Sequence, residues 1–358
     1  MLQGHCGTEE LGNVVSRSTP WNLGVWESLI RWKASGRFPH ALLLVGPSGI
    51  GKSLLAQHFA QTMLCEKLLE GDFACGSCSA CRRFQVGSHP DFLWIRPSST
   101  TESRTSENET SEETTPKSES RFIRIEQIRT LLDWIALTPH YDGYKLALLS
   151  PADCLNRQSA NGLLKTLEEP AGNSILMLAT ANPTQLPATV RSRCQEIRFS
   201  PASPEQALSW LAQKGIEDHT SAKQALILAK GAPLAALELI QNGTLEKRKT
   251  LFTGLESVVL GRTSPVAVAN EWNGHTMEMV ISLYYSWIED MIHLASATGA
   301  LLMNPDLASR LQSMANILGI QRLFTLLDDL NEVTRLIQGS TNPNQLLLLE
   351  NLLISLKI

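Results

Sequence analysis

The sequence has no excess of basic residues, few cysteines and no long apolar run. Its 358 residues carry 31 Lys and Arg against 35 Asp and Glu, a formal net charge of −4. This balance excludes a chain that holds nucleic acid by basic charge alone. No apolar run reaches the roughly 18 residues of a membrane helix, because Glu350 interrupts the most apolar stretch. The N-terminus lacks the basic-then-apolar order of a signal peptide, so we expect a soluble cytoplasmic protein.

The composition is that of a packed globular protein, with 43% hydrophobic and 18% charged residues over a length suited to two or three domains. One segment departs from it. Residues 97–120 hold six Glu, one Arg and one Lys and almost nothing apolar. Such a segment cannot bury enough apolar surface to offset its ordering entropy. We expect a disordered insertion here; a phosphorylated or partner-binding tail is the alternative.

Four of the seven cysteines are clustered in the pattern C-x9-C-x2-C-x2-C. Two-residue spacings let thiolates converge on one ion, and four thiolates without a nearby His suit a closed structural Zn²⁺ site. A disulfide pair, which a cytosolic chain disfavours, and buried unligated thiols are the alternatives. The predicted zinc module covers about residues 65–81. Its candidate ligands are Cys65, Cys75, Cys78 and Cys81.

Apolar runs alternate with helical patterns over the first 200 residues, which predicts an α/β fold with a parallel sheet covered on both faces. Beyond about residue 200 only helical patterns remain, with shorter helices over 201–243 and longer ones over 244–358. Apolar stripes in the longer helices are most simply core, with an oligomer contact as the alternative. The predicted strands are 41–45, 92–95, 145–149, 174–179 and 194–199.

A phosphate-binding loop follows the first predicted strand and opens a helix. Residues 46–53 fit G-x-x-x-x-G-K-S in full. The glycines let backbone N–H groups point at phosphate oxygens, and the helix N-terminus adds its positive dipole end. Lys52 supplies a charge to the terminal phosphates, and the Ser53 hydroxyl can ligate Mg²⁺. The candidate nucleotide-binding residues are Gly46, Pro47, Ser48, Gly49, Ile50, Gly51, Lys52 and Ser53.

The groups that activate water for hydrolysis are missing from their expected place. P-loop hydrolases carry an Asp near Mg²⁺ at the end of a neighbouring strand. Here the strand at 145–149 runs into Ser150 and Pro151, and neither is acidic. Asp153 lies beyond that position, and we expect it to cap the next turn. The sequence therefore predicts that ATP, with Mg²⁺, is bound without useful turnover.

Further motifs point to a family. Residues 159–170 read SANGLLKTLEEP, which is similar to the clamp-loader signature that follows the Walker B strand, and residues 192–194 match its SRC motif. The segment 38–41 (FPHA), the four-cysteine module and the segment 89–91 (HPD) also fit. Together these motifs cover most of residues 20–200. The chain resembles the AAA+ clamp-loader family of bacterial DNA polymerase III, a DNA-directed DNA polymerase and nucleotidyltransferase.

The resemblance implies an AAA+ domain over residues 1–200, a helical lid over 201–243 and a helical collar over 244–358. The collar would build a hetero-pentameric ring with gamma/tau and delta-type subunits, which loads the sliding clamp on primed DNA. The resemblance also implies that Arg193 acts in trans as an arginine finger on an adjacent ATPase subunit. Such fingers contribute about 10³–10⁵ in rate. An arginine satisfied locally at a strand start is the alternative.

The ATP-hydrolysing gamma/tau-type subunit is the main alternative within the family. Against it stand Ser150 and Pro151 in place of acidic residues, Ala181 in place of a polar sensor, and Leu234 where the lid would offer a sensor arginine. Outside the family, the alternatives are a stand-alone P-loop ATPase and a scaffold that binds partners without nucleotide. Basic residues such as Arg157 and Lys165 are too few to predict direct DNA contact.

Overall fold

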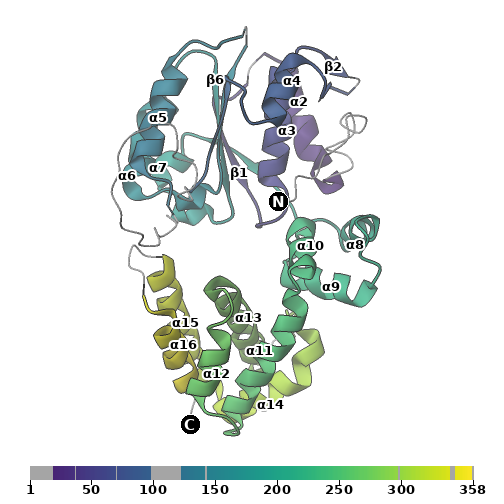
Figure 1. Ribbon diagram of the computed structural model, residues 1–358, viewed down its shortest axis with the longest axis vertical. Helices are drawn as coiled ribbons and strands as arrows, with labels where there is room; N and C mark the ends of the chain where they lie inside the picture. Colours follow the sequence, from purple (N-terminus) through teal and green to yellow (C-terminus); the bar gives the residue numbers. More distant parts are fainter. Residues whose placement is uncertain are drawn as a thin grey trace, which may run out of the picture. The chain divides into compact units, whose positions relative to one another are not determined.

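The computed structural model describes residues 19–36, 38–69, 71–97, 122–141, 143–296, 299–338 and 343–356 (Figure 1). The chain divides into two compact units, one up to Ala207 and one from Leu208 onward. The insertion predicted at 97–120 lies, apart from Pro97, outside the described residues. Within the described ranges, no helix is long and apolar enough to cross a membrane.

A five-stranded parallel sheet forms the centre of the first unit. Its strand order is β4-β5-β6-β1-β7, so the strand before the phosphate loop has a neighbour on each side. Every residue of β5 and β6 is buried, as expected of strands covered on both faces. The bounds agree with the predicted ones to within one residue. The strands are β1 (Ala41–Val45), β4 (Phe92–Ile95), β5 (Lys145–Leu149), β6 (Ser174–Thr180) and β7 (Gln195–Arg198).

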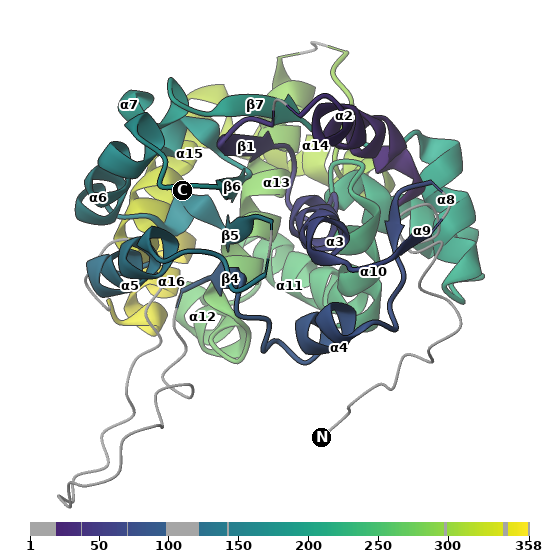
Figure 2. The same cartoon turned by 90° about the horizontal axis from the view of Figure 1, so that it is seen from above.

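Helices cover both faces of this sheet. Figures 1 and 2 show α5, α6 and α7 on one side of the strands and α2 and α3 on the other. Leu43, Leu149 and Leu178 of the sheet pack with Ile128 of α5 and Leu163 of α6 in one apolar cluster. A short hairpin, β2 (Leu68–Leu69) and β3 (Phe73–Ala74), was not expected. The helical elements are η2 (Pro20–Asn22), α2 (Leu23–Ala34), α3 (Lys52–Leu64), α4 (Ser79–Gln85), α5 (Ile125–Ala136), η3 (Ala152–Cys154), α6 (Arg157–Glu168), η4 (Pro183–Gln185) and α7 (Ala188–Arg191).

The second unit is built from helices in the part of the chain that is described. The apolar stripes predicted as core are buried, including Tyr284 and Trp287 of α13 and Leu311 and Met314 of α14. The α/β unit followed by a helical region confirms the predicted fold class. The helical elements are α8 (Pro204–Gln213), which begins within the first unit, α9 (His219–Leu228), α10 (Pro233–Gln241), α11 (Thr244–Val259), α12 (Pro265–Trp272), α13 (Met277–Ala295), η5 (Pro305–Leu307), α14 (Ala308–Leu318), α15 (Ile320–Gln338) and α16 (Gln345–Ile354).

A buried polar network joins α11 and α13 to the segment before α14. Arg248 is fully buried and donates to the side chains of Asn304 (2.7 and 2.9 Å) and Asp306 (2.8 and 2.9 Å). Asp290 is also fully buried, and it accepts the backbone N–H groups of Met303 (2.8 Å) and Asn304 (2.7 Å). Because the buried charges are hydrogen-bonded, the network stays compatible with the apolar core around it.

Candidate functional site

The loop after β1 has the backbone of a phosphate cradle. Gly49 and Gly51 take φ angles of 72° and 96°. This left-handed region is open mainly to glycine, so the loop needs these residues to curl. The carbonyl of Ile50 accepts hydrogen bonds from Trp21 Nε1 and Asn22 Nδ2, both at 2.8 Å. The segment before α2 therefore holds the loop in place.

Lys52 lies inside this loop at the N-terminus of α3. Its Nζ donates to the carbonyls of Gly46 (2.7 Å) and Pro47 (2.8 Å), and the residue is 8% exposed. Burial lowers the pKa of Lys52 from 10.5 to about 8, and the attraction of Asp153 offsets part of that effect. The ammonium is therefore in position for a phosphate, which would compete with the two carbonyls for it.

The hydroxyl of Ser53 meets the residue that ends β5. The Oγ atoms of Ser53 and Ser150 lie 2.5 Å apart and form a hydrogen bond. In P-loop NTPases, the hydroxyl of the loop Ser or Thr and a Walker B Asp hold Mg²⁺ together. Ser150 thus lies beside Ser53, where a P-loop hydrolase carries an acid.

Asp153 does not cap the next turn, which corrects the expectation. Its carboxylate accepts hydrogen bonds from the hydroxyl of Thr180 and from the backbone N–H groups of Ala181 (3.0 Å) and Asn182 (3.3 Å). The physical reason is that η3 brings the carboxylate next to the end of β6, where three donors converge. Asp153 therefore joins the chain after β5 to the chain after β6.

Arg193 lies near the amino ends of the strands, whereas the phosphate loop lies at their carboxyl ends. β1 and β7 run parallel over four paired residues, and the last pair is Val45 with Arg198. Arg193 precedes β7 at its amino end, whereas Gly46 follows β1 at its carboxyl end. The paired residues alone span about 10 Å. Arg193 is therefore not part of the phosphate site of its own chain.

The guanidinium of Arg193 has local partners. Its Nε donates to Glu168 Oε1 (2.8 Å), Nη2 lies 2.5 Å from the same oxygen, and Nη1 donates to the carbonyl of Thr189 (2.9 Å). The side chains of Arg193 and Glu168 are 34% and 51% exposed. Water competes for such a pair, which is typically worth about 0–1 kcal/mol. These contacts would not prevent a stronger anionic partner from binding Arg193.

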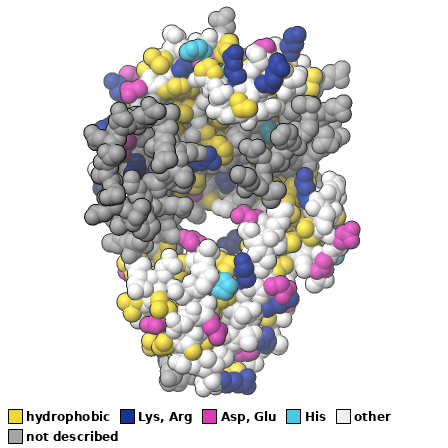
Figure 3. Space-filling model, in the orientation of Figure 1, with side chains coloured by type: hydrophobic (Ala, Val, Ile, Leu, Met, Phe, Trp, Pro, Cys, Tyr) yellow, Lys and Arg dark blue, Asp and Glu magenta, His cyan; other side chains and the backbone are white. Residues whose placement is uncertain are grey.

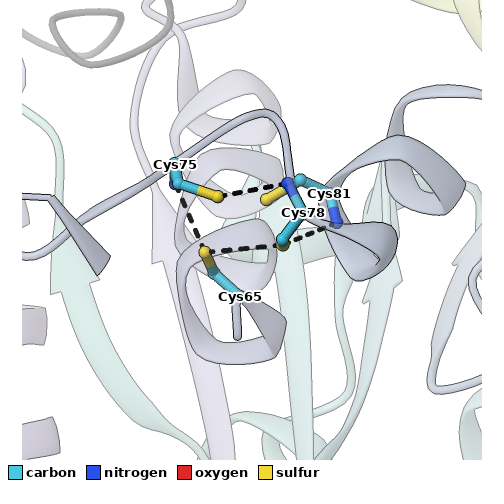
Figure 4. Close-up of side chains that lie close together, drawn as sticks. All are labelled: Cys65, Cys75, Cys78 and Cys81. Carbon is cyan, nitrogen blue, oxygen red and sulfur yellow. Dashed lines mark hydrogen bonds between the residues drawn. The ribbon is translucent and has the colours of Figure 1, made fainter. Parts of the chain in front are cut away.

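The four clustered cysteines converge, as predicted. Figure 4 shows their thiols pointing toward one another, with Cys65 after α3, Cys75 and Cys78 after β3, and Cys81 in α4. All four Sγ atoms lie within 4.8 Å of one another, and those of Cys65 and Cys78 are 3.9 Å apart. Zinc–sulfur bonds of about 2.3 Å in a tetrahedron place sulfurs about 3.8 Å apart. All four are free thiols, so this geometry suits one ion better than a disulfide.

Family comparisons cover both units. The model described as DNA polymerase III, delta subunit, matches residues 22–203. The model described as DNA polymerase III, delta subunit, C terminal, matches residues 242–357. The chain belongs to the DNA polymerase III delta subunit family.

The individual relatives of this delta-family chain belong to two subunit types, delta' and tau, which match different shares of it. It is 29% identical to the DNA polymerase III subunit delta' of Pseudomonas aeruginosa, over 94% of this chain and 96% of that relative. It is 28% identical to the delta' subunit of Escherichia coli, over 94% and 95%. The tau subunit of Escherichia coli is 30% identical, but over 63% of this chain and 32% of that relative. The similarity to delta' therefore extends along most of the chain, whereas the similarity to tau covers a smaller part. Within the family, the sequence motifs also resemble the delta' type.

Three contacts at the candidate sites of the delta-family chain were not predicted. They are the hydroxyl pair of Ser53 with Ser150, the contacts of Asp153 with the end of β6, and the ion pair of Arg193 with Glu168. Glu168 was visible in the sequence as part of the TLEEP segment, but no local pattern there pointed to Arg193. Each contact joins residues that are far apart in the chain.

Several basic side chains of the described residues are exposed. Arg157 and Lys165 are exposed on α6, and Arg82 and Arg83 are exposed on α4. On the face shown in Figure 3, Lys and Arg side chains are interspersed with Asp and Glu over the helices of the second unit. This distribution fits a chain with a small net charge.

Proposed function

We propose that the chain is a delta'-type clamp-loader subunit that supplies Arg193 in trans to a neighbouring ATPase subunit. The observation that carries this proposal is the position of Arg193. It lies at the end of the strands opposite to its own phosphate loop, and its side chain is partly exposed. An arginine that enters a neighbour's site stabilises the charge on the transferring phosphoryl group, worth about 10³–10⁵ in rate. The similarity to delta' subunits over most of the chain supports this role.

In this role the chain belongs to a cytoplasmic ring of five subunits, with gamma/tau and delta types as neighbours. The ring opens the sliding clamp and places it on primed DNA. Relatives named gamma and tau match over about half to two thirds of this chain, as expected if subunits of one complex share a domain. Residues 1–200 form the AAA+ domain, 201–243 the lid and 244–358 the collar that joins the ring.

The phosphate loop binds a nucleoside triphosphate without useful turnover in this proposal. Lys52 and the N-terminus of α3 favour the phosphates. Ser150, beside Ser53, has no charge with which to hold Mg²⁺ or to polarise an attacking water. The chain therefore completes the active site of another subunit and does not turn over its own nucleotide.

The four cysteines hold one structural zinc ion in the same proposal. Four thiolates close the coordination sphere, so the ion has no open position for catalysis. By joining the end of α3 to α4, zinc would stabilise a module whose strands and helix are short. The binding free energy of the ion would then contribute to the stability of the fold.

Reconstitution with candidate gamma/tau and delta-type subunits tests the role of Arg193. The measurement is the DNA-stimulated ATPase of the complex with wild type, Arg193→Ala and Arg191→Ala. Arg191 is the matched control because it is an exposed arginine two residues away, on α7. We expect Arg193→Ala to slow hydrolysis at the adjacent site by about 10³ or more, and Arg191→Ala to leave it unchanged.

Two results would overturn the proposal. One is an ATPase that Arg193→Ala leaves intact in a fully assembled complex. The other is steady ATP turnover by the isolated chain that Lys52→Ala abolishes, because the chain would then be an ATPase in its own right.

A further inference from the structure

We infer that the nucleotide in the phosphate loop is held without a magnesium ion. This inference rests on the proposed nucleotide binding at residues 46–53 and adds its metal requirement. The phosphate-loop motif predicts that Mg²⁺ accompanies ATP, with the Ser53 hydroxyl as a ligand. The contacts of Ser53, Ser150 and Asp153 show that the residues present do not suit this ion.

The first observation is the neutral partner of Ser53. Mg²⁺ is a hard cation that proteins bind through one or two carboxylates together with substrate phosphates. The group beside Ser53 is the Ser150 hydroxyl, with the two Oγ atoms 2.5 Å apart. A hydroxyl carries no charge, so it leaves the charge of a divalent ion uncompensated where a carboxylate would offset it.

The second observation concerns Asp153, the acid whose charge acts on Lys52. Its two oxygens already accept three hydrogen bonds from the Thr180 side chain and the N–H groups of Ala181 and Asn182. A carboxylate has about four acceptor sites, so three are in use. Only one site is left for a metal ion, and using any other site would break the link between the ends of β5 and β6. Asp153 is therefore a poor replacement for the missing acid.

The third observation is that a positive partner for phosphate is present without a metal. Lys52 is nearly buried inside the loop, and its Nζ now rests on the carbonyls of Gly46 and Pro47. The glycine-rich backbone and the N-terminus of α3 add N–H groups that suit anions. A metal-free triphosphate is more negative than its magnesium complex, so these groups attract it more strongly. Affinity should then depend on Lys52, and magnesium should not increase it.

Binding of the fluorescent nucleotide mant-ATP to the purified full chain tests this inference in two buffers, one with excess magnesium and one with EDTA. We expect magnesium to leave the dissociation constant unchanged or to raise it, because magnesium converts free nucleotide into the complex that these groups attract less. Ser150→Asp restores an acid beside Ser53, and we expect magnesium to tighten its binding by about tenfold or more. Lys52→Ala should lose binding in both buffers, which shows that the signal comes from the loop.

Each outcome decides the inference. Wild-type binding that magnesium tightens by about tenfold or more would overturn it while leaving nucleotide binding in place. Wild-type binding in neither buffer would overturn both the inference and the proposed nucleotide site. Neither result bears on Arg193, whose role is tested by the ATPase of the complex. If Ser150→Asp does not fold, as judged by circular dichroism, the comparison of wild type in the two buffers still decides.

Discussion

Arg193 and Glu168 form an ion pair in which Nη2 of the arginine lies 2.5 Å from Oε1 of the glutamate. The arginine Nε donates to the same oxygen, and Nη1 donates to the carbonyl of Thr189. Each nitrogen of the guanidinium thus has a partner in its own chain. If Arg193 binds a phosphate of the nucleotide held by a neighbouring subunit, it must break some of these hydrogen bonds. Glu168 would then compete with the phosphate.

We expect Glu168→Gln to raise the DNA-stimulated ATPase of the reconstituted complex by about two- to fivefold. The reason is that the exposed ion pair, worth up to about 1 kcal/mol, no longer has to be broken. Steady-state ATPase with saturating ATP and DNA measures the effect. Glu169→Gln is the matched control, since Glu169 is the next residue and is also exposed. A fall toward the rate of Arg193→Ala would contradict the prediction and indicate that Glu168 orients the finger.

Metal analysis of the purified chain should find about one zinc per chain, bound by the four-cysteine cluster. The double variant Cys78→Ser/Cys81→Ser should lose the zinc and melt at a lower temperature, because Cys81 is buried and two thiolates cannot close the site. Cys154→Ser, which changes a cysteine outside the cluster, is the control and should keep the metal. A metal-free chain, or a double variant that retains zinc, would refute the assignment.

Local patterns were sufficient to predict the strands, the phosphate loop and the cysteine cluster. An apolar run bounded by polar residues or glycine marks a strand within a residue, and the loop and cluster depend on spacings of a few residues. The Ser53–Ser150 contact joins residues 97 positions apart, and Asp153 meets Thr180 across 27. Such pairs depend on the order and register of strands, which no local spacing encodes. The two-residue strands β2 and β3 are too short to produce a period.

Gly46 should tolerate no side chain, because a Cβ there would lie 2.8 Å from both the Cβ and the carbonyl oxygen of Phe199. We expect Gly46→Ala to lower the free energy of unfolding by about 1–3 kcal/mol and to weaken nucleotide binding. Gly24→Ala is the matched control: its Cβ would meet nothing within 4 Å in α2. Alanine there should be neutral or stabilise by up to about 1 kcal/mol. Urea unfolding of the full chain measures the free energy of unfolding of both variants. Equal values for Gly46→Ala and Gly24→Ala would contradict the close approach of Gly46 to Phe199.

Arg248 should be the most costly charged side chain to remove from α11. It is fully buried, and its four hydrogen bonds satisfy Asn304 and Asp306. Replacing it with Met leaves the buried oxygen of Asn304 and the Asp306 carboxylate without this partner. We expect Arg248→Met to cost about 3 kcal/mol, the low end for a broken buried pair, because Asp306 is 41% exposed and water replaces part of the contact.

The neighbouring residue on α11 offers a control that separates burial from charge. Lys249 also pairs with an acid, Glu246, at 2.9 Å, but its side chain is 60% exposed. Lys249→Met removes the same charge and should cost less than about 1 kcal/mol. Urea unfolding followed by tryptophan fluorescence suits the measurement, since Trp272 and Trp287 lie in the core of this unit. If the two variants unfolded alike, the buried network would contribute no more than a surface pair, and the second unit would depend on its apolar core alone.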